Sequence, residues 1–224
     1  MRYGACMRLY TFLHSPNALK VRLALAELDV SYEPVEINLF RGEQRAESFA
    51  QINPHRKVPV LEDGPLVLRE SNAILVYLGR THGTTRWPDI PASEARALQW
   101  LFFDSAHLTP HCSAIWWTNV VVPTAGLPPV AEAVVERATA EATRSLDLLE
   151  GELDGKQYLL GSALSLADCA VGAAVALLRG SRLDDAERWP RVVAYRERLR
   201  ARDSWVAARG DAITDLGAAA TRAG

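Results

Sequence analysis

The stretch Asn53-Pro-His-Arg-Lys-Val-Pro-Val-Leu-Glu62, followed by Glu70-Ser-Asn-Ala-Ile-Leu-Val-Tyr-Leu78, decides the fold of this chain. Pro59 has no backbone N–H to give to a sheet ladder, so it must begin a strand or lie on an edge. Glu70 and Ser71 stand at the start of a helical pattern. A carboxylate and a hydroxyl at a helix start suit the ammonium and the carboxylate of a ligand. Together the two segments predict a site for a small zwitterionic peptide.

The composition is that of an ordinary globular protein. Of the 224 residues, 49% are apolar and the formal net charge is -2, which disfavours nucleic-acid binding because that needs a clustered basic face. No apolar run is long enough to span a bilayer. The scattered cysteines Cys6, Cys112 and Cys169 form no CxxC pair, so we expect a reducing compartment, the cytoplasm. Met1–Cys6 lacks the apolar core of a secretion signal, and we expect it to be a dispensable extension.

The first third of the chain alternates strand and helix patterns in the order β-α-β-α-β-β-α. Strands are expected at residues 8–12, 32–37, 58–61 and 66–68, and helices at residues 16–28, 46–52 and 71–78. Residues 83–91 contain two prolines and a glycine without periodicity, which indicates a break. We therefore expect a first domain at residues 1–82, a linker at 83–92 and a second domain at 93–224.

Beyond the break only helical patterns occur, so the second domain is predicted to be all-helical. The expected helices cover residues 93–115, 128–153, 165–178 and 190–202. The third is apolar on all sides, as a buried helix is. Asp168 follows Ser165 by three residues, which is the spacing of a capping box. We interpret Asp168 as part of a helix cap and not as a catalytic acid.

Ser15, Pro16 and Asn17 lie between the first strand and the first helix. A serine followed by proline is an ordinary helix start, so Ser15 can be an N-cap alone. The same geometry, a hydroxyl beside free backbone N–H groups, also stabilises a thiolate. The residues by themselves leave both interpretations possible.

The two segments quoted first have similar alternatives. Pro59 can be a trans proline on an edge strand, or a cis proline that frees the Val58 backbone to pair with an extended peptide. Glu70 and Ser71 can be a plain helix cap, or they can hold the two charged groups of a ligand.

Three segments together resemble the glutathione S-transferase superfamily. They are Ser15-Pro-Asn-Ala-Leu-Lys-Val-Arg22, Ile52-Asn-Pro with Lys57-Val-Pro-Val-Leu61, and Glu70-Ser-Asn-Ala-Ile with Tyr77-Leu78. Ser165-Leu-Ala-Asp-Cys-Ala-Val171 resembles the helix-start motif of that superfamily's C-terminal domain. The resemblance covers nearly the whole chain. It implies a bacterial-type cytosolic class that uses serine or asparagine, with a thioredoxin-like α/β domain followed by an all-α helical bundle.

The resemblance also implies a role for each matching position in binding glutathione. Val58 would bind the cysteinyl backbone, with Pro59 in the cis form. Glu70 and Ser71 would hold the γ-glutamyl end. The residues that would reach the glycyl carboxylate are Lys57, Arg56 and Gln44.

For the thiol, the resemblance leaves three candidates. Ser15 matches the activating hydroxyl of the serine-type classes, Asn17 matches the asparagine of related bacterial and fungal classes, and His14 is a third candidate. The chain departs from the superfamily pattern in two ways. Arg56 stands where many members have glycine, and no cysteine occupies the Ser15 position, which disfavours the thioltransferase classes.

Aromatic residues mark one face of the helix expected at residues 93–115. Trp100, Phe103 and His107 share this face, and Trp116 lies beyond them. Such a stripe is usually core or interface. The resemblance implies instead that this helix helps to line an electrophile pocket, with Phe103, His107 and Trp116 as candidates.

The pair His107 and His111, with Cys112 adjacent, has part of the pattern of a metal site. No further cluster of ligands completes it, and Pro110 disturbs the helix. We expect no metal.

The resemblance implies a transferase that conjugates the glutathione thiolate to a small hydrophobic electrophile, acting as a homodimer without nucleic-acid or membrane partners. Two alternatives remain. One is a glutathione-dependent disulfide or peroxide reductase, and the other is a non-catalytic binding module of the same fold.

Overall fold

The computed structural model describes residues 7–83 and 85–216. Its strands form one mixed sheet in the order β2-β1-β3-β4. The first strand, β1 (Arg8–Thr11), pairs in parallel with β2 (Glu33–Glu36) and antiparallel with β3 (Val60–Asp63). The last, β4 (Leu66–Arg69), pairs antiparallel with β3. Pro59 immediately precedes β3, so this strand begins without needing a donor from the proline.

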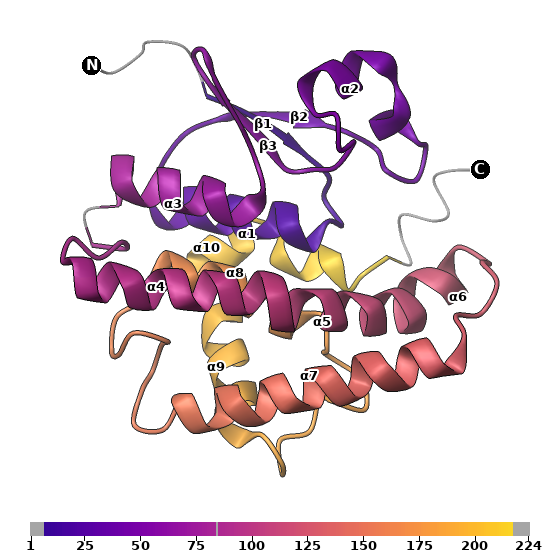
Figure 1. Cartoon of the computed structure of the whole chain (residues 1–224), viewed down its shortest axis with the longest axis vertical. Coiled ribbons are helices and arrows are strands. Elements are labelled where there is room, and N and C mark those ends of the chain that lie inside the picture. Colours follow the sequence, from indigo (N-terminus) through magenta and orange to yellow (C-terminus); the bar gives the residue numbers. More distant parts are fainter. Residues whose placement is uncertain (1–6, 84, 217–224) are drawn as a thin grey trace.

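Three helices complete the first part of the chain. They are α1 (Pro16–Glu27), α2 (Glu47–Ile52), which follows a 3-10 turn at Glu43–Arg45, and α3 (Ser71–His82). The resulting order β-α-β-α-β-β-α confirms the predicted thioredoxin-like α/β fold. Figure 1 shows α1 and α3 between the sheet and the remaining helices, with α2 on the other side of the strands.

No strand follows β4 in the part of the chain that the structure describes, and the predicted all-helical second part is confirmed. The helices are α4 (Pro91–Phe103), α5 (Thr109–Trp116), α6 (Val122–Thr124), α7 (Glu132–Glu152), α8 (Leu166–Ala176), α9 (Pro190–Arg200), α10 (Asp203–Ala207) and the 3-10 helix η4 (Gly210–Ile213). The sequence analysis does not predict α6, α10 or η4, because elements this short carry too little periodicity. Among the described helices, none is both long and apolar enough to cross a membrane. The predicted extension at residues 1–6 and the tail from residue 217 lie outside the described residues.

The helix expected over residues 93–115 is not one continuous α-helix. Two π-helical turns, η2 (Asp104–Leu108) and η3 (Trp117–Val121), separate α4, α5 and α6. Pro110 and Pro123 each come just after one of these turns. A proline has no N–H, and its ring collides with the carbonyl four residues earlier in an α-helix. A wider π turn therefore admits the proline without ending the helix.

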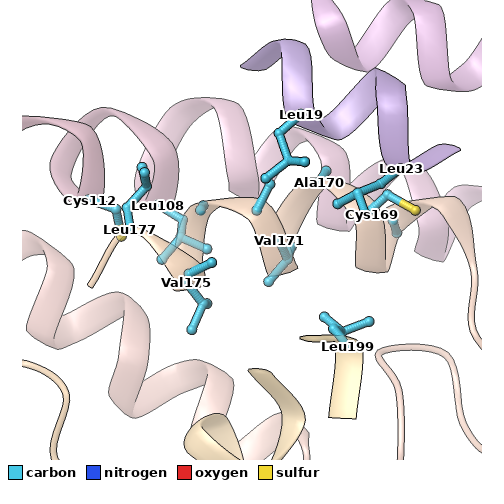
Figure 2. Packing of buried hydrophobic residues seen from close by; sticks show 14 of the residues in the cluster. Leu19, Leu23, Leu108, Cys112, Cys169, Ala170, Val171, Val175, Leu177 and Leu199 are labelled. Carbon is cyan, nitrogen blue, oxygen red and sulfur yellow. The ribbon is translucent and has the colours of Figure 1, made fainter. Parts of the chain in front are cut away.

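Helix α8 forms the centre of the hydrophobic core, and each of its residues is buried. Figure 2 shows Leu19 and Leu23 of α1 pointing toward Ala170 and Cys169 of α8. The core is therefore shared between the sheet-containing part and the helical part. This packing fixes α1, which carries part of the candidate site, against the helices.

The start of α8 is the capping box that the sequence predicts. Asp168 accepts hydrogen bonds from the Ser165 backbone N–H at 2.7 Å and from the Ser165 hydroxyl at 2.8 Å. It also accepts from the Leu159 backbone N–H at 2.9 Å and from the Tyr195 hydroxyl at 3.1 Å. Burial raises the pKa of this carboxyl group. These bonds confirm the predicted capping box.

Candidate functional site

A cleft of about 350 Å³ lies where the sheet-containing part meets the helical part. Its lining includes six residues that the sequence analysis selected, Asn17, Lys57, Val58, Pro59, Glu70 and Ser71. The helical part contributes Ser105, Thr109, Pro110 and Ser113. The fold therefore brings four separate sequence segments around one cavity.

The segment before β3 presents free backbone groups to the cleft. The Val58–Pro59 peptide bond is cis. Both residues are buried, and the strand pairing of β3 with β1 starts only at Val60. No hydrogen bond joins the Val58 backbone to another residue of the described chain. The Val58 N–H and C=O groups are therefore available to an extended ligand.

The start of α3 is not capped by any side chain of the described residues. Glu70 takes the N-cap position with φ at 71°, a backbone conformation that non-glycine residues rarely adopt. Glu70 is exposed, and Ser71 is half-buried as the first helical residue. The first-turn N–H groups and the helix dipole therefore favour an anion at this end of the cleft.

The start of α1 places its two candidates differently. Ser15 is buried and caps the helix, with its side-chain oxygen accepting from the Ala18 N–H at 3.3 Å. Asn17, two residues later, is half-buried and lines the cleft. His14 donates through Nδ1 to the Ala212 carbonyl oxygen at 2.7 Å and lies outside the cleft lining. Of the three candidates for the thiol, Asn17 is the one that the cleft exposes.

Arg22 holds the loop between β1 and α1 in place. It donates to the Thr11 hydroxyl at 3.1 Å and to the carbonyl oxygens of Phe12 and Leu13 at 3.1 and 2.9 Å. A fourth bond, of 3.0 Å, reaches the Ala208 carbonyl in the helical part. Burial lowers the pKa of Arg22 to about 10, so the side chain stays charged at neutral pH. The loop that leads into Ser15 is thus fixed from both parts of the molecule.

Of the residues expected to reach a glycyl carboxylate, only Lys57 lines the cleft. Arg56 donates to the Arg45 carbonyl and pairs with Glu47 at 3.7 Å, which turns it toward α2. Its φ of 54° lies in the left-handed region, which glycine adopts more readily than other residues. Gln44 donates to the Leu39 carbonyl at 3.4 Å and lies outside the cleft lining.

The aromatic residues expected to form an electrophile pocket do not line the cleft. The Phe103 ring lies 5.4 Å from Trp100 and 6.0 Å from His107. Trp116 is buried and donates to the Ile213 carbonyl at 2.7 Å. The π turn η2 changes the helical register after Phe103, so α-helical spacing no longer tells which residues share a face. The small residues Ser105, Thr109 and Ser113 border the cleft instead.

Two asparagines of the cleft were not selected from the sequence. Asn53 is buried, donates to the Lys57 carbonyl at 2.7 Å and accepts from the His55 N–H at 3.0 Å, so it shapes the loop before Pro59. An asparagine before proline is a turn signal that could have identified it. Asn72 follows Ser71 and joins α3 to the helical part, for which the local sequence offers no signal.

The residues with a partial metal-site pattern do not form one. Cys112 is buried, and burial raises the pKa of its thiol. Within residues 7–83 and 85–216, no group of three or more histidine, cysteine, aspartate or glutamate side chains is arranged to hold a metal ion.

Comparison with known proteins identifies the family. The models for "Glutathione S-transferase, N-terminal domain" and "Glutathione S-transferase, C-terminal domain" match residues 5–80 and 132–198. Glutathione S-transferase theta-1 of Bos taurus is 31% identical over 206 residues, which cover 87% of this chain and 82% of that protein. This chain belongs to the glutathione S-transferase superfamily.

Solved structures agree with this assignment. A possible glutathione S-transferase from Rhodopseudomonas palustris is 33% identical with a TM-score of 0.81, over 89% of this chain and 96% of that one. A glutathione transferase from Burkholderia graminis, with two glutathione molecules bound per subunit, is 27% identical with a TM-score of 0.80, over 94% of this chain and 89% of that one. The curated relatives are named as glutathione S-transferases, and the chain is a glutathione transferase by enzyme class.

Proposed function

We propose that this glutathione transferase binds glutathione in the cleft and joins its sulfur to a small electrophile. One observation carries the proposal: Val58–Pro59, Glu70–Ser71 and Asn17 line a single cavity. These segments correspond to three parts of one tripeptide, its cysteinyl backbone, its γ-glutamyl end and its thiol.

In the proposed complex, glutathione lies extended along the segment before β3. The Val58 backbone N–H and C=O pair with the cysteinyl residue as an added strand. The γ-glutamyl carboxylate binds the first-turn N–H groups of α3 and the Ser71 hydroxyl, while Glu70 pairs with the ammonium. Lys57 is exposed and is the proposed partner of the glycyl carboxylate, because Arg56 and Gln44 are turned away.

We propose Asn17 as the residue that donates to the sulfur, with Ser15 acting as the cap that supports this helix start. Each unit by which the thiol pKa falls needs about 1.4 kcal/mol, and one hydrogen bond to a charged group supplies about 1.5–3 kcal/mol. The thiol proton passes to solvent. The sulfur then bonds to the electrophilic carbon, and the leaving group departs with the electron pair of the broken bond.

The proposed electrophile is small and hydrophobic and rests against the helical wall of the cleft. Val58, Pro59 and Pro110 provide the apolar part of the lining. Holding the acceptor beside the thiolate contributes to the rate through proximity. Three aromatic candidates lie outside this lining, namely Phe103, His107 and Trp116. They would contact the electrophile only if they moved toward the cleft.

The test is a parallel assay of the purified protein with an aryl halide and with a glutathionyl disulfide, together with calorimetric titration of glutathione. We expect glutathione binding and turnover of the aryl halide. Binding without turnover of either acceptor would favour the non-catalytic module, and absence of binding would contradict the proposal.

A second candidate function is reduction of glutathionyl disulfides. The Burkholderia graminis neighbour, which holds two glutathione molecules per subunit, favours it. In this reaction the bound thiolate would attack a sulfur of a mixed disulfide, giving glutathione disulfide and releasing the other thiolate. Faster turnover of the disulfide than of the aryl halide would select this candidate.

We propose a cytoplasmic homodimer as the working form. Phe102 on α4 is 71% exposed, and Leu66 and Val67 of the edge strand β4 are exposed as well, as expected for surfaces that a second copy covers. The two described cysteines, Cys112 and Cys169, are free and buried, which fits a reducing compartment. Light scattering of the purified chain tests the dimer, and a monomer at micromolar concentration would contradict it.

A further inference from the structure

A buried ion pair joins the two parts of the molecule beneath the cleft. The Lys20 ammonium on α1 donates to Asp104 Oδ2 at 2.5 Å and to the Thr109 hydroxyl at 3.0 Å. Thr109 in turn donates to Asp104 Oδ1 at 2.6 Å. The side chains of Lys20 and Asp104 are 1% and 0% exposed. The charges are therefore paired away from solvent.

The π turn η2 makes this arrangement possible. Asp104 and Thr109 are five residues apart, and the Thr109 N–H bonds to the Asp104 carbonyl across the turn. In a π turn residues at this spacing lie one above the other, whereas in an α-helix they point in different directions. Both side chains can therefore meet the same ammonium.

The ion pair is connected to the helices that carry both ends of the proposed glutathione site. Lys20 lies one helical turn after Asn17 on α1. On the other side, Asn72 directly follows Ser71 and donates to Asp104 Oδ2 at 3.0 Å and to the Leu101 carbonyl at 2.7 Å. Lys20, Asn72 and Thr109 all border the cleft. One carboxylate on the helical part is thus tied to the helix of Asn17 and to the helix of Ser71.

A buried ion pair is a poor device for stability alone. Removing two charges from water is unfavourable, and well-packed apolar residues often replace such a pair without loss of stability. A second connection between the parts lies at the other end of α1, where Arg202 donates to Glu27 at 2.5 and 2.8 Å. This second contact lies outside the cleft and offers a matched comparison.

We propose that Lys20 and Asp104 are positioning residues, which set the helical wall of the cleft at a fixed place relative to the bound glutathione sulfur. The inference rests on the proposed function, because the helical wall receives the electrophile. Glutathione itself is held by Val58, Glu70 and Ser71, all in the first part of the chain. Loss of the pair should therefore affect the reaction with the electrophile much more than the binding of glutathione.

The test replaces the pair with apolar residues of similar size, in the double variant Lys20→Met with Asp104→Leu. We expect unfolding as cooperative as that of the wild type and a glutathione Kd within about threefold. The value of kcat/KM for the aryl halide should fall about 100-fold, the size of effect that a misplacement of about 1 Å produces. Glu27→Gln is the control. It should lower thermal stability, and its kcat/KM for the aryl halide should stay close to the wild-type value.

The single variants guard against a double variant that fails to fold. Lys20→Arg keeps a cation for Asp104 and should retain more kcat/KM than Lys20→Met at equal glutathione affinity. Equal kcat/KM for the wild type, the folded double variant and Lys20→Met would overturn the positioning role alone. Wild-type protein that binds glutathione but turns over no electrophile would overturn the proposed function, and this inference with it.

Discussion

Helices α8 and α3 each begin with a serine and an acidic residue, but the two starts are built in opposite ways. At α8, Ser165 and Asp168 satisfy each other, and the carboxylate is fully buried with four donors. At α3, Glu70 is exposed at a φ of 71°, and no side chain of the described residues caps the helix. The first start lies in the core and the second borders the cleft.

The difference separates a structural helix start from one suited to a ligand. A capping box uses the first-turn N–H groups within the chain, which stabilises the helix and leaves nothing for an anion. A start without a cap keeps those donors for a bound carboxylate. The start of α1 combines both patterns, because Ser15 caps the helix while Asn17 borders the cleft.

The largest effect is expected at the start of α8, where the capping box lies. Asp168→Ala should lower the free energy of unfolding by about 3 kcal/mol, more than the loss of an exposed cap, because several buried donors lose their acceptor. Chemical denaturation measures this change. Turnover at 25 °C, where the variant is still folded, should match that of the wild type. A fully stable variant without turnover would show that Asp168 takes part in the chemistry.

At the start of α1, substitutions of Ser15 and of Asn17 should have different effects. Asn17→Ala should raise the pKa of the bound glutathione thiol by about one unit, because a hydrogen bond of about 1.5 kcal/mol to the sulfur is lost. The thiolate absorbance followed against pH measures this shift. Ser15→Ala should shift the thiol pKa less and should lower the free energy of unfolding by about 1 kcal/mol as a lost cap. A larger pKa shift for Ser15→Ala than for Asn17→Ala would mean that Ser15, and not Asn17, donates to the sulfur.

The smallest effect is expected from the strained backbone at the uncapped start. Glu70→Gly and Glu70→Ala remove the same carboxylate, but only glycine adopts a φ of 71° without strain. Glu70→Gly should therefore be more stable than Glu70→Ala by about 1 kcal/mol in chemical denaturation. Both variants should bind glutathione equally weakly. Equal stability of the two would mean that Glu70 is not strained.

Local signals were enough to predict much of this molecule. The order of strands and helices, the capping box at Ser165 and the strand that follows Pro59 were readable because each depends on neighbouring residues. The resemblance to a known superfamily added the cis bond before Pro59 and the grouping of Val58 with Glu70 and Ser71 in one cleft.

The features that the sequence did not reveal depend on contacts between residues far apart in the chain. The π turn at Asp104 changes the helical register, so the face predicted for Phe103, His107 and Trp116 does not border the cleft. Lys20 and Asp104 are 84 residues apart in the chain, and no periodic pattern connects them. Whether Ser15 or Asn17 lies at the cleft depends on the side-chain direction at one helix start, which residue spacing alone does not determine.

The most direct measurement compares one serine from each helix start, by titrating glutathione calorimetrically into Ser71→Ala and Ser165→Ala. Ser71→Ala should bind glutathione at least about 10-fold more weakly, because a hydrogen bond to a charged group contributes about 1.5–3 kcal/mol, and its stability should match the wild type. Ser165→Ala should bind like the wild type and unfold more easily. Unchanged glutathione affinity in Ser71→Ala, or a greater loss of affinity in Ser165→Ala, would contradict the assignment of the α3 start as the γ-glutamyl site.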